Sequence, residues 1–394
     1  MNKISKIIIV LLLVSMMACQ KANVNLLTEE IFATTAKKQV EIAKQKATIL
    51  NLAANLKDVD VSTIIFPQEE GNAGEIYWQV FKNHLNTRAP EEQALIGQMR
   101  AVAEAFDTEF KAEENAKITP QLVELAKAEA QKLAELPELA ELEKGAKRKA
   151  MRLVGETINI PENLRSVKPV SPDLIRGYGN AFLCKGLLKE AAGDKTAAET
   201  ALQTMIAMGQ HFAQDANYFH YLNGMAVVLS GSLSLKQFYE RTGNKEKQAA
   251  AEKVEKEANK QLTQVYQLGA VDPDRQAFNI LDGLGFLDDG LPILTGIATS
   301  ETVPAGLRAK AVESLLAGYT FRYLMAIRAG KPPETTEYAP PSEARLQSLN
   351  QVASSSNKAL AQMASSAKTT LEKMKGQTSP ERTKYWKEVS EAKN

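Results

Sequence analysis

Hydrophobic positions along most of this chain recur at intervals of three and four residues, the period of an amphipathic helix. The helix formers Ala, Leu, Glu, Lys and Gln dominate the same segments. The pattern therefore predicts an all-α protein. Helices are expected over 26–56, 78–85, 90–110 and 120–154, and Pro137 should break or kink the last of them.

One patch, Val59–Phe66, is β-like and ends at Pro67, so a loop or a short strand is expected there. With this exception, residues 19–165 are expected to form an N-terminal helical region. The segment Ser166–Pro172 carries two prolines within four residues, which favours extended chain over helix. It predicts a boundary, after which a second helical domain covers residues 173–330.

Two turns inside the second domain share one pattern. Gly193-Asp194 and Gly243-Asn244 each follow a helical segment and precede an alanine-rich one. Glycine is favoured where a helix ends in left-handed geometry, and Asp or Asn can cap the helix that follows. The pattern predicts antiparallel helical hairpins. The segment resembles the tetratricopeptide hairpin, with its aromatic, small, turn and packing positions occupied by Phe182, Gly186, Gly193, Ala198 and Leu202.

The two glycine turns lie 50 residues apart, whereas tetratricopeptide repeats have a period of about 34 residues. Either an additional helix, for instance Tyr218–Leu229, lies between the hairpins, or the helices are longer than in the family. Generic antiparallel helix pairs are the alternative to a true repeat. The prediction is therefore an irregular, tetratricopeptide-like and α-solenoid-like helical body.

Further along, Gly290–Ala298 leads through Pro304 to Leu307–Leu316. An early proline in the first helix and the Arg-x-x-Ala start of the second resemble one HEAT-type unit. Residues 331–345, rich in proline, are expected to form a stiff linker. Beyond the linker, residues 346–394 are expected to form a polar, coiled-coil-like helix, which could pack on the body, pair with a second copy or await a partner. Its thin apolar seam consists of Leu346, Leu349, Ala353, Ser356, Leu360, Met363, Ala367, Thr370 and Met374.

The first residues carry a targeting pattern. Lys3 and Lys6 precede a short apolar run, and Ala18 lies immediately before Cys19. This stretch resembles the bacterial lipobox, with Met16 in place of the usual leucine. The resemblance implies a signal peptide over residues 1–18, acylation of Cys19 and a protein anchored to a membrane of the cell envelope. Gln20 after the anchor favours the outer membrane over the inner one; an ordinary secreted protein cut elsewhere is the alternative.

Composition limits the remaining possibilities. With 44% hydrophobic and 24% charged residues, the chain is globular, not disordered. Removal of Lys3 and Lys6 with the signal leaves 46 basic against 47 acidic side chains, which gives no electrostatic footprint for nucleic acid. Lipidation of Cys19 would leave only Cys184, so no intramolecular disulfide is expected, and Cys184 is predicted to be a small buried hydrophobe.

Candidate chemistry is sparse. Neither a His-Glu-x-x-His nor a Gly-x-Ser-x-Gly motif is present. His211 and Asp215 lie one turn apart, but His220 falls on the opposite side of a continuous helix, so no metal site is predicted there. A cluster of acidic residues leaves a carboxylate-lined pocket open as an alternative: Asp272, Asp274, Asp282, Asp288 and Asp289.

These observations favour a lipid-anchored envelope scaffold that binds other envelope proteins, without a cofactor or an enzymatic activity. The alternative is a lipoprotein that binds a small molecule or glycan in a helical cleft; an enzyme ranks third. For either of the first two functions, the predicted ligand or partner surface is aromatic: Phe182, Phe212, Tyr218, Phe219, Tyr221, Tyr319, Phe321 and Tyr323.

Overall fold

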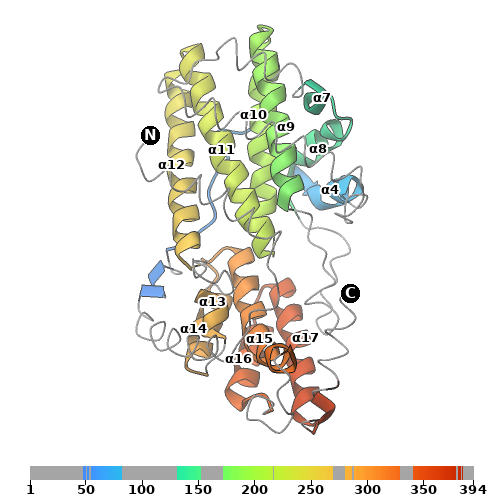
Figure 1. The fold of residues 1–394 in the computed structure, drawn as a ribbon. Helices are drawn as coiled ribbons and strands as arrows, with labels where there is room; N and C mark the ends of the chain where they lie inside the picture. The colour runs from blue at the N-terminus through green and yellow to red at the C-terminus, as the bar shows by residue number, and fades with distance from the viewer. Residues whose placement is uncertain are drawn as a thin grey trace.

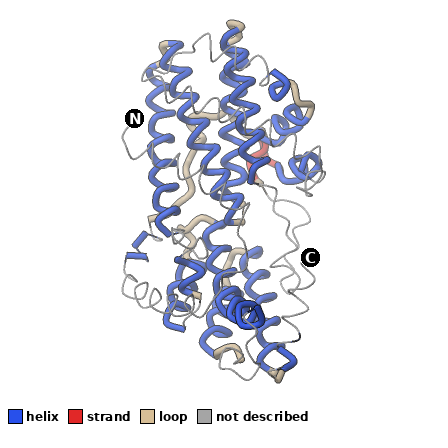
Figure 2. The backbone as a smooth tube through the Cα atoms, in the orientation of Figure 1, coloured by secondary structure: helices blue, strands red, loops and turns tan. Residues whose placement is uncertain are grey.

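The computed structural model describes residues 48–49, 51–52, 55–81, 131–151, 172–215, 217–268, 280–285, 288–328, 340–378, 380–382 and 384. These residues confirm the predicted all-α class: helices make up nearly all of the regular structure, and a short strand pair is the exception (Figures 1 and 2). Within the described part of the chain, no helix combines the length and the apolar character that a membrane span requires. The signal peptide and Cys19 lie outside the described residues.

The upper half of the molecule in Figure 1 is built on an antiparallel bundle of four long helices, which we call the bundle. It consists of α9 (Pro172–Ala191), α10 (Lys195–Gln214), α11 (Tyr218–Thr242) and α12 (Lys245–Leu268). Helix α11 packs against α9, α10 and α12, so the second hairpin lies against both helices of the first. The bundle is thus built of two antiparallel hairpins in contact.

Both predicted turns are confirmed. Gly193 and Gly243 adopt positive φ angles of 84° and 78°, where a side chain would be strained. The next residue caps the following helix in each case: the Asp194 carboxylate accepts from the backbone N–H of Ala197 at 3.0 Å, and the Asn244 side chain accepts from that of Lys247 at 3.2 Å.

The 50-residue spacing is explained by long helices. Residues 218–229 are the first half of α11, not an additional helix between the hairpins. Gly186 shows the predicted close packing of the first hairpin, because a Cβ there would lie 3.1 Å from the Leu202 side chain and 3.4 Å from the carbonyl oxygen of Ala198.

Helices α10 and α11 approach each other closely at Gly224. A Cβ on Gly224 would lie 2.4 Å from the backbone nitrogen of Ala213 and 2.5 Å from the carbonyl oxygen of Gly209. Real Cβ atoms do not approach backbone so closely, and the backbone of a packed helix cannot shift without disturbing its neighbours. Glycine at position 224 therefore sets the distance between these two helices.

A second unit, the C-terminal module, lies below the bundle in Figure 1 and combines short helices with one long helix. It contains α13 (Ile280–Leu284), a 3₁₀ turn at Asp288–Gly290, α14 (Leu291–Thr299), α15 (Ala305–Arg328), α16 (Glu343–Ala353) and α17 (Lys358–Lys375). Helices α14 and α15 form the predicted hairpin, with Pro292 in the first turn of α14. Gly306 of α15 lies against the Cβ of Tyr221, which joins the module to the bundle.

The prediction of one C-terminal helix is wrong for the described residues. The chain forms a hairpin of α16 and α17, and α16 begins at Glu343, inside the predicted linker; residues 331–339 and 385–394 lie outside the description. Asn357 starts α17 by accepting from the backbone N–H of Leu360 at 3.1 Å. The seam packs back on the body: its members are buried except for half-buried Ala353 and exposed Ser356.

Buried arginines close helix ends in the C-terminal module. Arg308 donates to the carbonyl oxygen of Ala298 at the end of α14, and Arg345 donates to that of Gly285, just past α13, at 2.7 Å. Arg382 donates to the carbonyl oxygen of Met374 at the end of α17. The last carbonyls of a helix have no partner within the helix and carry partial negative charge, so a guanidinium satisfies them well.

The described part of the N-terminal region packs beside the bundle. It includes α4 (Ala73–Phe81), α7 (Gln131–Ala134) and α8 (Glu138–Ala146). Pro137 separates α7 from α8 as predicted, but the helix expected to reach residue 154 ends at Ala146. A strand replaces it: β2 (Arg148–Ala150) pairs in parallel with β1 (Glu69–Asn72). The expected β-like patch itself is a loop.

Residues 55–68, which we call the strap, include that loop. The strap begins beside α12, and at its other end the Gln68 side chain donates to the carbonyl oxygen of Ala146 at 2.9 Å and lies against His211 of α10. Leu56, Val59, Val61 and Ile64 are buried in the core. Gln261 of α12 is fully buried and binds the strap backbone: its Oε1 accepts from the backbone N–H of Lys57 at 3.0 Å, and its Nε2 donates to the carbonyl oxygen of Asn55 at 3.4 Å. A single side-chain amide thus forms hydrogen bonds to a backbone N–H and to a backbone carbonyl oxygen two residues apart.

Candidate functional site

The predicted aromatic surface is not a cleft. Phe182, Phe212 and Tyr221 are fully buried in the core, and Tyr218 and Tyr319 are buried as well. Phe219 is the exception, 51% exposed and so on the surface of α11. The side chains of Phe321 and Tyr323 lie outside the description, although their backbone belongs to α15. The five buried residues of this set therefore pack in the core and do not line a cleft.

Phe212 illustrates this structural role. Its ring stacks on Tyr77 of α4 at 5.6 Å between centroids and meets Phe81 edge-on at 5.5 Å. Aromatic pairs in these arrangements bury large areas at favourable ring geometry. The N-terminal region is thus packed against α10 through aromatic contacts that lie far apart in sequence.

The two described histidines belong to separate hydrogen-bond networks. His211 Nδ1 lies 2.9 Å from the Tyr77 hydroxyl, and Gln68 Nε2 lies 3.3 Å from His211 Nε2. His220 Nδ1 instead lies 2.5 Å from a carboxylate oxygen of Asp215. The chain breaks between α10 and α11, so the continuous helix assumed for the sequence does not exist, yet the described residues contain no group of three ligands for a metal.

Burial dominates the protonation of these side chains. It lowers the pKa of His211 to about 4, because a charged imidazole would lose its hydration; a backbone hydrogen bond at Arg148 opposes this shift. Burial also raises the pKa of the Tyr77 hydroxyl well above its ordinary value. At neutral pH the pair is therefore an uncharged link between α4 and α10.

Cys184 is a buried free thiol, as predicted. Burial raises its pKa to about 12, so the thiolate needed for nucleophilic chemistry does not form at neutral pH. The cysteine packs within α9 as a small hydrophobe.

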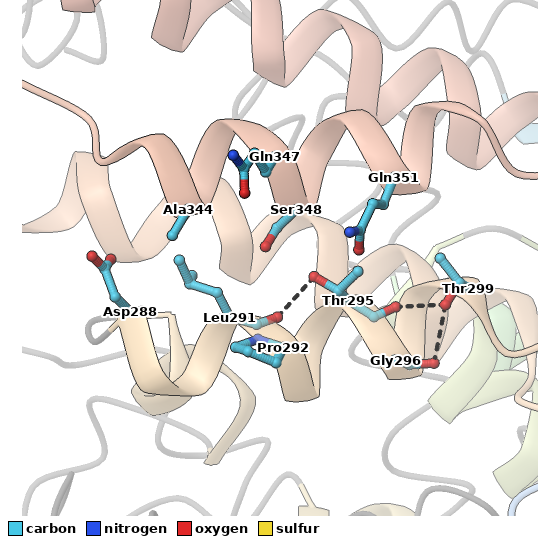
Figure 3. A pocket seen from close by; sticks show the side chains of 10 residues that line it. All are labelled: Asp288, Leu291, Pro292, Thr295, Gly296, Thr299, Ala344, Gln347, Ser348 and Gln351. Atoms are coloured by element: carbon cyan, nitrogen blue, oxygen red, sulfur yellow. Dashed lines mark hydrogen bonds between the residues drawn. The ribbon is translucent and has the colours of Figure 1, made fainter.

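A groove of 390 Å³ lies between α14 and α16 and shares no lining residue with the predicted aromatic surface (Figure 3). Figure 3 shows Ser348 and Gln351 pointing from α16 toward α14. The lining residues are small or uncharged, with one carboxylate: Asp288, Leu291, Pro292, Thr295, Gly296, Thr299, Ala344, Gln347, Ser348 and Gln351.

The sequence held a partial signal for this groove. The predicted seam assigns Leu346 and Leu349 to the buried face of the helix. Helical periodicity then predicts that Gln347 and Gln351 lie on another face, toward the surface. Of the acidic cluster, only Asp288 lines this groove, so the described residues do not form the carboxylate-lined pocket that was the alternative. Asp289 is not among the lining residues; Asp272 and Asp274 lie outside the description, as does the side chain of Asp282.

A second hollow of 780 Å³ lies on the other side of α16, against α17. Its charged side chains form ion pairs, Lys375 with Glu343 and Lys368 with Glu372. Gln347 and Gln351 line this hollow too, so both grooves open beside the same two amides.

Comparison of the chain with protein-family models, curated proteins and solved structures finds no match. The function must therefore be inferred from the residues and their geometry.

Proposed function

We propose that this protein is a lipid-anchored scaffold of the cell envelope, attached to the membrane through Cys19 and binding other envelope proteins through its helical body. The observation that carries the proposal is the stacking of α9–α12. Two hairpins turn at left-handed glycines, and α11 packs against both helices of the first hairpin. Stacked hairpins of this kind present extended surfaces, which repeat proteins use for binding.

The buried ionisable side chains are consistent with a structural role. His211, Tyr77 and Cys184 are enclosed in the core, and the pKa shifts of all three favour their uncharged forms. Groups that act in acid–base or nucleophilic catalysis need access to a substrate. These three side chains therefore support packing and not turnover.

The lipid anchor is tested by substitution of its acceptor. Cys19→Ser should move the protein from the membrane to the soluble fraction, and mass spectrometry of the wild-type N-terminal peptide should show acyl chains on Cys19. Cys184→Ser is the matched control, because that thiol is buried and its loss should leave fractionation unchanged. A wild-type protein without acyl chains would contradict the anchor.

The scaffold role is tested by chemical cross-linking of intact envelopes followed by purification of the tagged, full-length protein. We expect one or more stoichiometric proteins whose cross-links map to lysines of the bundle or the C-terminal module. The control is residues 1–46 fused to an unrelated soluble protein, which keeps the anchor without the helical body. Recovery of the same proteins with this control, or of none with the wild type, would contradict the scaffold.

A further inference from the structure

The groove between α14 and α16 offers hydrogen-bonding groups without protein partners. Neither Gln347, Gln351 nor Ser348 makes a side-chain hydrogen bond to any residue in the described structure. Ser348 is only 8% exposed, and its hydroxyl points into the groove (Figure 3). These three side chains present donors and acceptors at the surface of the groove, so this wall is suited to a ligand that donates or accepts hydrogen bonds.

The opposite wall adds acceptors. The Thr295 hydroxyl donates to the carbonyl oxygen of Leu291, and the Thr299 hydroxyl donates to that of Thr295, both at 2.8 Å. Each hydroxyl oxygen keeps lone pairs for an incoming N–H. Gly296 lies between them, and a Cβ there would meet nothing within 4 Å, so a ligand backbone can approach this wall closely.

The spacing of the amides fits an extended polypeptide. Gln347 and Gln351 are one turn apart, a rise of about 6 Å along α16. Alternate residues of an extended chain repeat at about 6.6 Å. The protein already uses the same chemistry elsewhere, because Gln261 binds the N–H of Lys57 and the carbonyl oxygen of Asn55 in the strap.

The two ends of the groove differ in charge. Asp288 is the one charged residue among its described lining residues, and its exposed carboxylate accepts from the Ser342 hydroxyl at 2.9 Å. A basic side chain on a ligand would be attracted to this end, while the uncharged remainder favours main-chain contacts.

We propose that this groove binds an extended segment of a partner protein through its backbone, with a basic side chain of that segment at Asp288. The proposal rests on the scaffold function and adds the location and chemistry of one docking site. Gln347 and Gln351 would hold alternate peptide groups, while Thr295 and Thr299 would accept N–H groups from the other side.

The test uses the full mature chain and a displayed library of random linear dodecapeptides. In the Gly296→Leu variant the new side chain occupies the groove, where a Cβ meets no other atom within 4 Å. Leucine is also a better helix former than glycine, so the variant should retain the fold. Gln362→Leu is the control, on an exposed position of α17 that lines neither groove. Circular dichroism and the thermal midpoint check that both variants fold.

We expect peptides rich in small residues with one Lys or Arg to bind the wild type and Gln362→Leu equally. Gly296→Leu should weaken them at least tenfold, as should Gln347→Ala combined with Gln351→Ala. Asp288→Asn should weaken only peptides that keep the basic residue. N-methylation of alternate peptide nitrogens should abolish binding, because it removes the N–H donors.

Absence of any binder, equal binding to Gly296→Leu, or indifference to N-methylation would overturn the docking site. The scaffold function is tested separately from the docking site. If envelope partners still cross-link to the Gly296→Leu protein while no peptide binds the groove, the docking site fails and the scaffold stands. If the wild type has no envelope partner, the scaffold fails whatever the peptides do.

Discussion

The bundle and the C-terminal module are both built of antiparallel helices, but they differ in how the helices meet. In the bundle, helix sides approach through glycines, with Gly224 directly against Gly209. In the module, the close glycine contacts involve helix ends: Gly318 of α15 lies against Gly285, just past α13.

Arginine is also used differently in the two regions. Arg241 of the bundle pairs in two-pronged geometry with the Glu190 carboxylate, at 2.8 and 2.9 Å, and so joins α11 to α9. Arg308, Arg345 and Arg382 of the module donate to carbonyl groups at helix ends. Two of these arginines close the short helices α13 and α14, of 5 and 9 residues, in which unsatisfied ends are a larger share of the backbone than in the long helices of the bundle.

The largest expected effect is at the helix approach of the bundle. Gly224→Ala should lower the free energy of unfolding by about 3 kcal/mol, since the added Cβ meets backbone atoms. Gly296→Ala of α14 is the matched control: its Cβ meets open space, so it should stabilise the protein by up to about 1 kcal/mol. Chemical denaturation measures both; equal effects would contradict the close backbone contact of α10 and α11 at Gly224.

Acid should affect the bundle through His211. Its pKa is about 4 in the folded protein and about 6.5 when unfolded, so the unfolded state binds more protons between these values. Stability should therefore fall as pH falls from 6.5 to 4, by about 3 kcal/mol from this residue. His211→Gln should remove that part of the loss, measured as unfolding free energy against pH. An unchanged pH profile would show that His211 is not buried as described.

Loss of a buried arginine of the C-terminal module should destabilise mainly that module. Arg345→Met leaves the carbonyl oxygens of Leu315 and Gly285 without this donor, and should cost about 2 kcal/mol. Hydrogen exchange should accelerate in α13 and α15 more than in α9 or α10. Arg241→Met in the bundle is the comparison, with about 2 kcal/mol expected because its ion pair with Glu190 is largely buried, and exchange should then accelerate in α9 and α11. Faster exchange throughout the bundle of the Arg345→Met protein would contradict the division.

Helix caps should give the smallest effect, equal in both regions. Asp194→Ala removes the cap of α10, and Asn357→Ala removes that of α17. Each should cost about 1 kcal/mol, because each side chain accepts from one otherwise unpaired N–H. Thermal and chemical denaturation compare the two, and a difference above about 1 kcal/mol would show that the cap contribution depends on the region.

Local signals in the sequence predicted the structure well. The turns at Gly193 and Gly243 and the break at Pro137 follow from backbone restrictions of those residues alone. The split of the C-terminal helix was also encoded locally, since Ser354–Asn357 is a typical start signal for a new helix. The apolar seam keeps the same three- and four-residue spacing on both sides of this signal, so its periodicity predicted one helix where there are two.

Long-range features could not be predicted. Phe182, Phe212 and Tyr221 have the same apolar pattern whether they fill a core or line a cleft, and only the fold decides. The contact between Tyr77 and His211 joins residues 134 positions apart. The α14–α16 groove likewise depends on two helices whose relative position no spacing rule gives.

Native mass spectrometry of the tagged protein, extracted from envelopes in mild detergent without cross-linking, tests the scaffold most directly. The account predicts a particle heavier than one chain by its acyl groups and by at least one different protein, with dissociation releasing both components. A particle with the mass of a single chain, or of identical chains only, would contradict it.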